Sequence, residues 1–173
     1  MNTRAGFAGE DVPKSVVPSH YGDLSKGDVH KLVFGDNAIH TTTSGLEIRN
    51  PIGKDGTVED WDTAAKVWEY AITSRLTNFK PSAPINHDEK TDRPIIMEVE
   101  MEGVEDNEKP LEENPLLMTE TAWNPIKSRE HAIEVAMESW GCPAFWLARN
   151  SVLAAYAAGK ASALVVDVGA TSI

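Results

Sequence analysis

The sequence has very little cysteine, no excess of basic residues and no long apolar run. Its 173 residues include one cysteine, Cys142, which excludes an intrachain disulfide and is typical of a reducing compartment. The 16 basic residues are outnumbered by 27 acidic ones, and this net charge of −11 argues against binding to nucleic-acid phosphates over the whole surface. Lys160 and Asp167 interrupt the most apolar stretch, so no membrane-spanning helix is expected. These absences predict a soluble intracellular protein without a membrane partner.

The acidic residues are concentrated in one part of the chain. Residues 88–113 hold 11 acidic and 3 basic residues, a net charge of −8, which leaves −3 for the rest of the chain. The composition of the longer stretch 79–113 predicts an acidic insertion that forms a disordered loop. Apolar residues alternate with glutamates from Met97 to Glu102, so a short edge strand is the alternative.

The second half of the chain predicts an alternation of strands and helices. Apolar runs indicate three strands, at residues 116–119, 144–148 and 163–166. The first helix between them has Asn124 as its expected N-cap and Gly141 as its stop, and the second runs from Asn150 to Gly159. The stripe expected to be buried on the first helix consists of Ile126, Ile133, Met137 and Trp140. This order predicts an α/β fold with parallel strands, right-handed crossovers and ligand chemistry at the carboxyl ends of the strands.

The first half of the chain carries weaker signals. Glycine and proline divide its start into extended segments at residues 5–8 and 15–21, and the polar residues 22–31 predict an exposed loop. A strand is expected at residues 46–48. Asp60 is suited to the N-cap of the next helix, whose apolar stripe consists of Trp61, Ala65, Trp68 and Ile72. All five tryptophans are expected to lie in the core.

The end of the chain carries the pattern most suggestive of ligand chemistry. Asp167, Gly169 and Thr171 follow the apolar run 163–166. An Asp-x-Gly-x-Thr sequence after a buried strand can form a tight hairpin whose N–H groups face a phosphate, while the aspartate holds a hydrated metal ion. An ordinary turn at the end of a strand is the structural alternative. The five histidines have no metal-ligand spacing, so no further metal site is expected.

Four motifs then resemble one known family. Residues 5–11 with Pro13 resemble the opening motif of actins and actin-related proteins, and Asp60-Trp61-Asp62 resembles the helix that follows in that family. The remaining two motifs are Leu116 to Glu120 with Asn124-Pro125, and Ser151 to Gly159 with Val166-Asp167-x-Gly169. The chain is identified as a member of the actin family. Trp123, the residues 165–169 and the acidic insertion resemble the fungal type of the nuclear group that includes actin-related protein 4.

The resemblance implies a particular organisation. It implies an actin-like ATPase fold, related to ribonuclease H, of which the chain holds the first lobe only. The α/β core would comprise residues 1–21 and 52–173, with a small subdomain at 22–51 and the acidic insertion at 79–113. The family's first phosphate loop precedes the residue that matches Asn2. We therefore expect half of a nucleotide site, and weak or no ATP binding by this chain alone.

The resemblance also implies roles for individual residues. Arg4 matches a residue that contacts nucleotide phosphates, and Asp167 matches the carboxylate that holds magnesium through water. The second phosphate-binding hairpin is matched by Gly169, Ala170, Thr171 and Ser172, although the family has an acidic residue where Ala170 stands. Asn150 matches the glutamine that orients the attacking water in conventional actin, and it is one methylene shorter. The expected cofactor is therefore ATP with magnesium, with no catalytic residue and little or no hydrolysis.

The function that the resemblance implies is a non-catalytic scaffold subunit of nuclear chromatin-remodelling and histone-acetyltransferase complexes. Its expected partners are actin and a long helix of a remodelling ATPase or acetyltransferase scaffold, without direct sequence-specific DNA binding. The acidic insertion is a candidate contact for histones or nucleosomes. A filament-forming ATPase of the conventional actin type is the alternative, and the short loop between Tyr21 and Phe34 and the presence of Asn150 argue against it. A phosphotransferase of the related sugar-kinase fold lacks a candidate base beside Asp167.

Overall fold

Two units make up the chain in the computed structural model, which describes residues 2–26, 29–76 and 109–167. The first unit contains residues 1–50 and 66–108, and the second contains residues 51–65 and 109–173. The chain passes from one unit to the other after residues 50, 65 and 108, and the second of these passages lies inside helix α2 (Trp61–Glu69). The expected division into a core and an inserted subdomain at 22–51 stays a prediction. Residues 79–108, which make up most of the acidic insertion, lie outside the described residues.

The first unit is built from short antiparallel strands. Strand β1 (Asn2–Ala5) pairs with β2 (Ser15–Pro18), so the first strand begins earlier than residues 5–8. A three-stranded sheet of order β4-β3-β5 follows, and its members are β3 (Tyr21–Lys26), β4 (Val29–Val33) and β5 (Leu46–Arg49). Between β4 and β5 lies the short helix α1 (Asp36–His40), and the π-helix η1 (Tyr70–Ser74) contacts β1 and β2.

The prediction of an exposed loop at residues 22–31 is wrong, because β3 and β4 form a hairpin there. Gly22 is buried at the centre of the sheet, between Val33 on β4 and Leu46 on β5. A Cβ atom at residue 22 would lie 2.5 Å from Leu46 Cδ1 and 2.6 Å from Val33 Cγ2. The strand therefore needs glycine at this position so that both neighbours can pack against its backbone. The polar composition of these residues did not indicate strand β3, because β3 is buried by side chains of its neighbouring strands.

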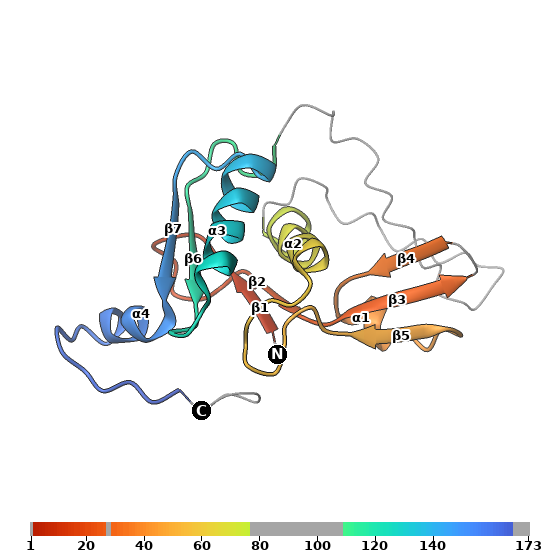
Figure 1. Ribbon diagram of the computed structural model, residues 1–173, viewed down its shortest axis with the longest axis horizontal. Coiled ribbons are helices and arrows are strands. Elements are labelled where there is room, and N and C mark those ends of the chain that lie inside the picture. Colours follow the sequence, from red (N-terminus) through yellow and green to blue (C-terminus); the bar gives the residue numbers. More distant parts are fainter. Residues whose placement is uncertain (1, 27–28, 77–108, 168–173) are drawn as a thin grey trace. The chain divides into compact units, whose positions relative to one another are not determined.

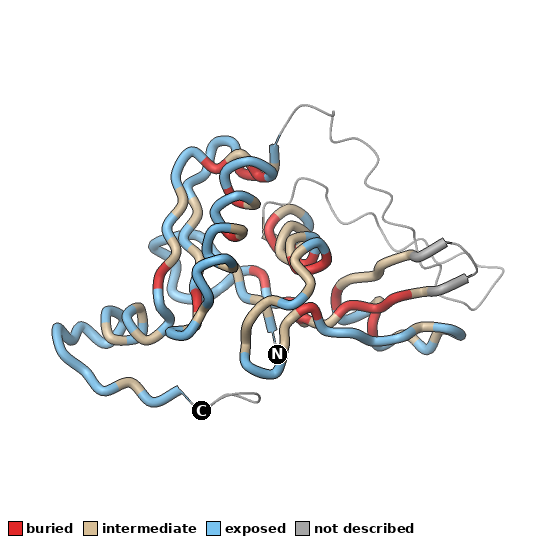
Figure 2. Tube along the Cα trace, viewed as in Figure 1, coloured by how far each residue is buried: buried red, intermediate tan, exposed pale blue. Residues whose placement is uncertain are grey.

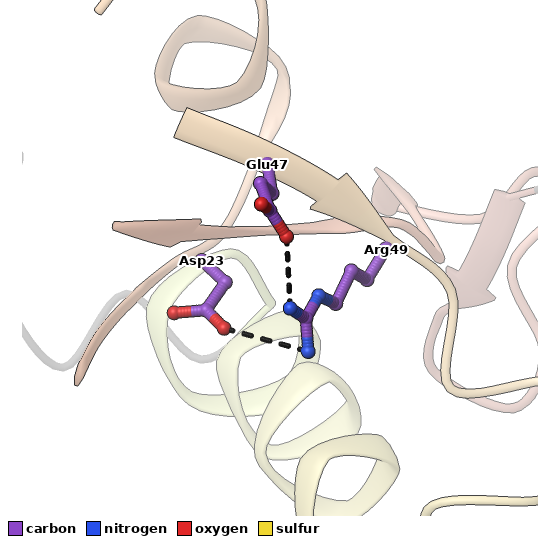
Figure 3. Close-up of polar contacts among 3 residues, drawn as sticks. All are labelled: Asp23, Glu47 and Arg49. Atoms are coloured by element: carbon purple, nitrogen blue, oxygen red, sulfur yellow. Dashed lines mark hydrogen bonds and ion pairs between the residues drawn. The ribbon is translucent and has the colours of Figure 1, made fainter. Parts of the chain in front are cut away.

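An arginine bridges two carboxylates on this sheet (Figure 3). Asp23 on β3 and Glu47 on β5 lie directly opposite each other in the register, a placement in which like charges repel. Arg49 Nη2 donates to Glu47 Oε2 at 2.8 Å, and its Nη1 lies 3.7 Å from Asp23 Oδ2. The hydrogen bond with Glu47 and the two negative charges raise the pKa of the Arg49 guanidinium. The three side chains together stabilise the pairing of β3 with β5.

The second unit confirms the first two strands of the predicted parallel series and the helices that follow them. Strand β6 (Leu116–Glu120) pairs in parallel with β7 (Phe145–Arg149). Helix α3 (Ile126–Glu134) and the π-helix η2 (Val135–Ser139) connect these strands, and α4 (Asn150–Ala157) follows β7. Figure 1 shows α3 alongside the pair of strands. Gly141 and Gly159, the two predicted stops, have φ of +71° and +65°, which glycine adopts without strain.

The buried side of α3 differs from the predicted stripe. Ala132, Ala136 and Trp140 are buried, whereas the predicted members Ile126, Ile133 and Met137 are 73%, 48% and 41% exposed. Alanines four residues apart allow a close approach of the helix to its neighbours. The larger apolar residues therefore lie at the side of the contact or face solvent. Figure 2 shows this narrow buried stripe, and it shows no buried residue along α4.

Of three further expectations, one is confirmed and two are corrected. Asp60 caps α2 as predicted, because its Oδ1 accepts the Thr63 N–H at 3.2 Å. The buried row of α2 and η1 is Ala64, Val67, Ala71 and Ile72, with Thr63 beside it, so only Ile72 of the predicted stripe is buried. At the end of the acidic insertion, Leu111 is buried and its N–H donates to the Trp140 carbonyl at 3.0 Å. Residues 109–113 therefore form an ordered turn and not part of a disordered loop.

Candidate functional site

Asp167 follows a segment that is extended but unpaired. Residues 163–166 are not a strand, and Leu164 and Val166 are 93% and 71% exposed, so the prediction of a buried strand is wrong. The segment after α4 runs apart from β6 and β7 in Figure 1. An apolar sequence becomes a strand only by hydrogen bonding to a neighbour, and no described strand pairs with this segment. Asp167 is accordingly exposed.

Asn150 is the residue that contacts Asp167. It directly follows β7 and begins α4. Its Nδ2 donates to Asp167 Oδ2 at 3.4 Å, and its Oδ1 accepts the Ser151 N–H at 2.9 Å. The structure therefore brings together two of the residues that the sequence singled out, at the carboxyl end of β7.

The other predicted nucleotide-binding residues are placed separately. Arg4 lies on β1, opposite Val16 of β2, and is exposed. Arg4 belongs to the first unit and Asp167 to the second. Gly169, Ala170, Thr171 and Ser172 lie outside the described residues. Their roles as phosphate ligands therefore stay predictions.

A polar cluster that the sequence analysis missed lies at the carboxyl end of β6. Glu120 is the last residue of β6, and only 5% of its side chain is exposed. Its Oε2 is 3.1 Å from Arg129 Nε and accepts the Asn124 amide at 3.0 Å. Asn124 is therefore not the N-cap of α3, since Pro125 takes that place. An acidic residue ending a strand, followed by an amide and an arginine, is the signal that could have indicated this cluster.

The loop after β6 is also tied to the segment before α2. Trp123, which is 53% exposed, donates its indole N–H to the Asp55 carbonyl at 2.9 Å. Asp55 Oδ1 accepts the Thr57 hydroxyl at 2.7 Å and the Thr57 N–H at 3.0 Å. These bonds favour the ionised carboxylate and lower the pKa of Asp55. The carboxyl end of β6 thus carries a network that holds two loops of the second unit together.

An open groove lies between α3 with η2 and strand β7. Its lining residues are Arg129, Ile133, Met137, Phe145, Trp146 and Leu147. Trp146 is 68% exposed, so Trp146 and Trp123 both contradict the prediction that all tryptophans lie in the core. Ile133 and Met137, which were expected in the buried stripe of the helix, line this groove instead. Nothing in the groove combines an acid or base with a nucleophile.

Cys142 and the metal-ligating residue types add no second site. Cys142 is buried as predicted, and burial raises the pKa of its thiol, which keeps the sulfur in its less reactive protonated form. Among the described residues, no three His, Cys, Asp or Glu side chains are grouped to hold a metal ion. Within the same ranges, none of the helices has the length and apolar character that crossing a membrane requires.

Comparisons with known proteins agree with the family that the motifs indicate. The family model described as Actin matches residues 1–173. Actin-related protein 4 of Emericella nidulans is 59% identical over 171 residues, which cover 99% of this chain and 36% of that protein. Actin-related protein 4 of Neurospora crassa is 51% identical over 97% of this chain and 36% of its own length. A Schizosaccharomyces pombe protein named SWI/SNF and RSC complexes subunit arp42 is 31% identical over 96% of this chain and 32% of its own length.

These matches cover nearly all of the chain, whereas the chain spans about a third of the length of these relatives. The α/β architecture with small sheets is consistent with the actin-like ATPase fold expected from the sequence. The family match extends over both units, including the small sheet of the first and the parallel strands of the second. The chain therefore belongs to the actin family.

Proposed function

We propose that this chain belongs to a non-catalytic, actin-related scaffold subunit of nuclear chromatin-remodelling and histone-acetyltransferase complexes. The observation that supports this most directly is its 59% identity to a protein named Actin-related protein 4. The relative named as a SWI/SNF and RSC complexes subunit supports a remodelling complex in particular. Since the chain spans little more than a third of the former relative, the proposal concerns the whole protein to which these residues belong.

The proposed ligand of that protein is ATP with magnesium, bound as a structural ligand. The Asp167 carboxylate is exposed and offers oxygens that can hold a hydrated magnesium ion through water, so the residue present fits the ion. Arg4 is exposed and carries the positive charge that a phosphate contact needs. The hairpin from Gly169 to Ser172 would contribute backbone N–H groups. Magnesium, when bound, supplies charge neutralisation for the phosphates, and bound ATP stabilises the folded protein by mass action.

Asn150 supports the absence of hydrolysis. Phosphoryl transfer to water depends on placing the attacking oxygen, and small displacements lower the rate strongly. The side chain at residue 150 is one methylene shorter than a glutamine. Its amide also lies against Asp167. A water molecule held by a longer amide would therefore not be held at the same position here.

The proposed partners follow from the same assignment. They are actin and a helical scaffold segment of a remodelling ATPase or acetyltransferase subunit, in the nucleus. Histone tails are basic, and the net charge of −8 within residues 88–113 is complementary to them. The overall acidic charge disfavours direct DNA binding.

Purification of the tagged full-length protein from nuclear extract tests the proposal. We expect actin and a remodelling or acetyltransferase scaffold to co-purify, and we expect bound ATP to be recovered unhydrolysed after a single-turnover incubation. The preparation should also fail to sediment as filaments when ATP is added. Hydrolysis at the rate of conventional actin under matched conditions, together with ATP-dependent sedimentation, would replace this proposal with the filament-forming alternative.

A further inference from the structure

The contact between Asn150 and Asp167 joins the start of α4 to the segment that follows this helix. Asn150 begins α4, whereas Asp167 lies in the segment that follows this helix. Both side chains are exposed, so the contact is not a by-product of core packing. Among the described residues, no other hydrogen bond or ion pair is made by the Asp167 carboxylate. The Asn150 amide is thus the group that orients this carboxylate.

Hydrogen-bonding chemistry determines which way the Asn150 amide faces. A backbone N–H can only donate, so the amide atom next to Ser151 N is the oxygen Oδ1. The NH₂ group must then face Asp167 Oδ2, and an ionised carboxylate is an acceptor for it. The amide oxygen, which could accept a hydrogen bond from an attacking water, already accepts one from the Ser151 N–H. The donor end is used by Asp167.

We propose that Asn150 is a positioning residue that holds the Asp167 carboxylate toward a hydrated magnesium ion. This inference rests on the proposed function, in which Asp167 holds magnesium through water. The side chain at residue 150 then serves metal binding in place of water activation. Some residues do not touch the metal but hydrogen-bond to a side chain that binds it. Removing such a residue typically lowers the metal affinity by about 10- to 100-fold. The 3.4 Å distance and the exposure of both residues favour the lower end of that range.

A double-mutant cycle in the full-length protein tests the inference. ATP affinity is measured for the unsubstituted protein, Asn150→Ala, Asp167→Asn and the double variant, each with magnesium and with EDTA. We expect Asn150→Ala to weaken magnesium-ATP binding about 10-fold and to leave binding in EDTA unchanged. In the Asp167→Asn background the same substitution should have no further effect, because the residue it acts through is already changed.

Asn124→Ala is the matched control, since Asn124 also donates its amide to a carboxylate in the second unit. It should lower stability without changing the magnesium dependence of ATP binding. A readout without nucleotide is hydrogen exchange, in which Asn150→Ala should raise the exchange rate of residues 163–167 in the nucleotide-free protein. Unchanged exchange of these residues would contradict the contact itself.

The outcomes separate the two proposals. The role of Asn150 would be overturned if Asn150→Ala lowered ATP affinity equally with magnesium and with EDTA, or if its effect added to that of Asp167→Asn. The proposal that the protein binds ATP would survive either result. Unchanged magnesium-ATP affinity in Asp167→Asn would overturn the metal-binding role of Asp167, and with it the proposed site. A reduced magnesium-dependent affinity in both single variants, with no further loss in the double variant, supports the inference.

Discussion

Each unit holds one nearly buried carboxylate beside a half-exposed arginine, but the two pairs are built differently. In the first unit, 9% of the Asp23 side chain is exposed, and its Oδ2 lies 3.7 Å from Arg49 Nη1. In the second unit, 5% of the Glu120 side chain is exposed, and its Oε2 lies 3.1 Å from Arg129 Nε. Asp23 and Arg49 come from neighbouring antiparallel strands, whereas Glu120 and Arg129 come from a strand and the helix that follows it.

The number of donors and acceptors also differs. Arg49 serves two carboxylates, Asp23 and Glu47, so it reduces a repulsion between them. Glu120 instead receives two donors, Arg129 and Asn124, and within the described residues it forms no contact with a second acid. Loss of the arginine should therefore expose a salt-sensitive repulsion in the first unit. In the second unit, loss of the arginine should leave the buried Glu120 carboxylate with too few hydrogen-bond donors. This should lower the free energy of unfolding more than the repulsion in the first unit does.

The largest effect is expected from Arg129→Met. This substitution keeps an apolar stem but removes a charged donor from Glu120, and we expect the free energy of unfolding to fall by about 2 kcal/mol. Urea denaturation of the full-length protein measures the loss. Adding Glu120→Gln to the same variant should recover part of it, because a neutral amide costs less to bury than a carboxylate. A variant as stable as the unsubstituted protein would show that solvent already satisfies Glu120.

A smaller effect is expected from Arg49→Met. Asp23 and Glu47 would then face each other without a bridging cation, and we expect a loss of about 1 kcal/mol in low salt. Salt screens both the lost attraction and the exposed repulsion, so the difference from the unsubstituted protein should shrink as ionic strength rises. Glu47→Gln in the Arg49→Met background is the control and should restore stability. A loss that is independent of salt would indicate packing of the Arg49 stem instead.

The smallest effect is expected at Asp55, an exposed carboxylate whose side chain accepts hydrogen bonds from Thr57. Hydrogen bonds from Thr57 lower its pKa in the folded state below that of the unfolded chain. Its contribution is therefore fully present above the unfolded pKa and is lost as the pH falls through the lower folded pKa. Thermal unfolding from neutral to acid pH should show a shallower acid decline for Asp55→Asn. Parallel curves for the two proteins would contradict this assignment.

Elements that depend on local chemistry could be predicted from the sequence. Strands β6 and β7 follow from apolar runs, and α2 begins after the predicted cap Asp60. The two predicted stops, Gly141 and Gly159, both have positive φ and follow α3–η2 and α4. The hairpin of β3 and β4 could not be predicted, because its burial depends on Val33 and Leu46 packing over Gly22. Residues 163–166 show the reverse case, in which an apolar run predicts a strand that has no described neighbour to pair with.

The candidate site divides in the same way. The sequence alone identified Asp167 and Asn150 as unusual positions, because both stand in motifs that resemble a known family. Neither motif indicates that the two side chains meet, since 17 positions separate them. The cluster of Glu120, Asn124 and Arg129 was missed because the same asparagine also fits the pattern of a helix N-cap. An asparagine can cap a helix or donate its amide to a carboxylate, and only its neighbours in the folded chain show which of the two it does.

Sequence by itself determined the family, the order of the α/β elements and the residue types available for chemistry, because each of these depends on motifs or on nearest neighbours in the chain. Tertiary structure decided which face of α3 is buried, how Arg49 bridges two strands and which way the Asn150 amide faces. These features depend on contacts between residues that are distant in sequence. Such contacts follow from close packing and from the pairing of donors with acceptors, and both conditions require the folded chain.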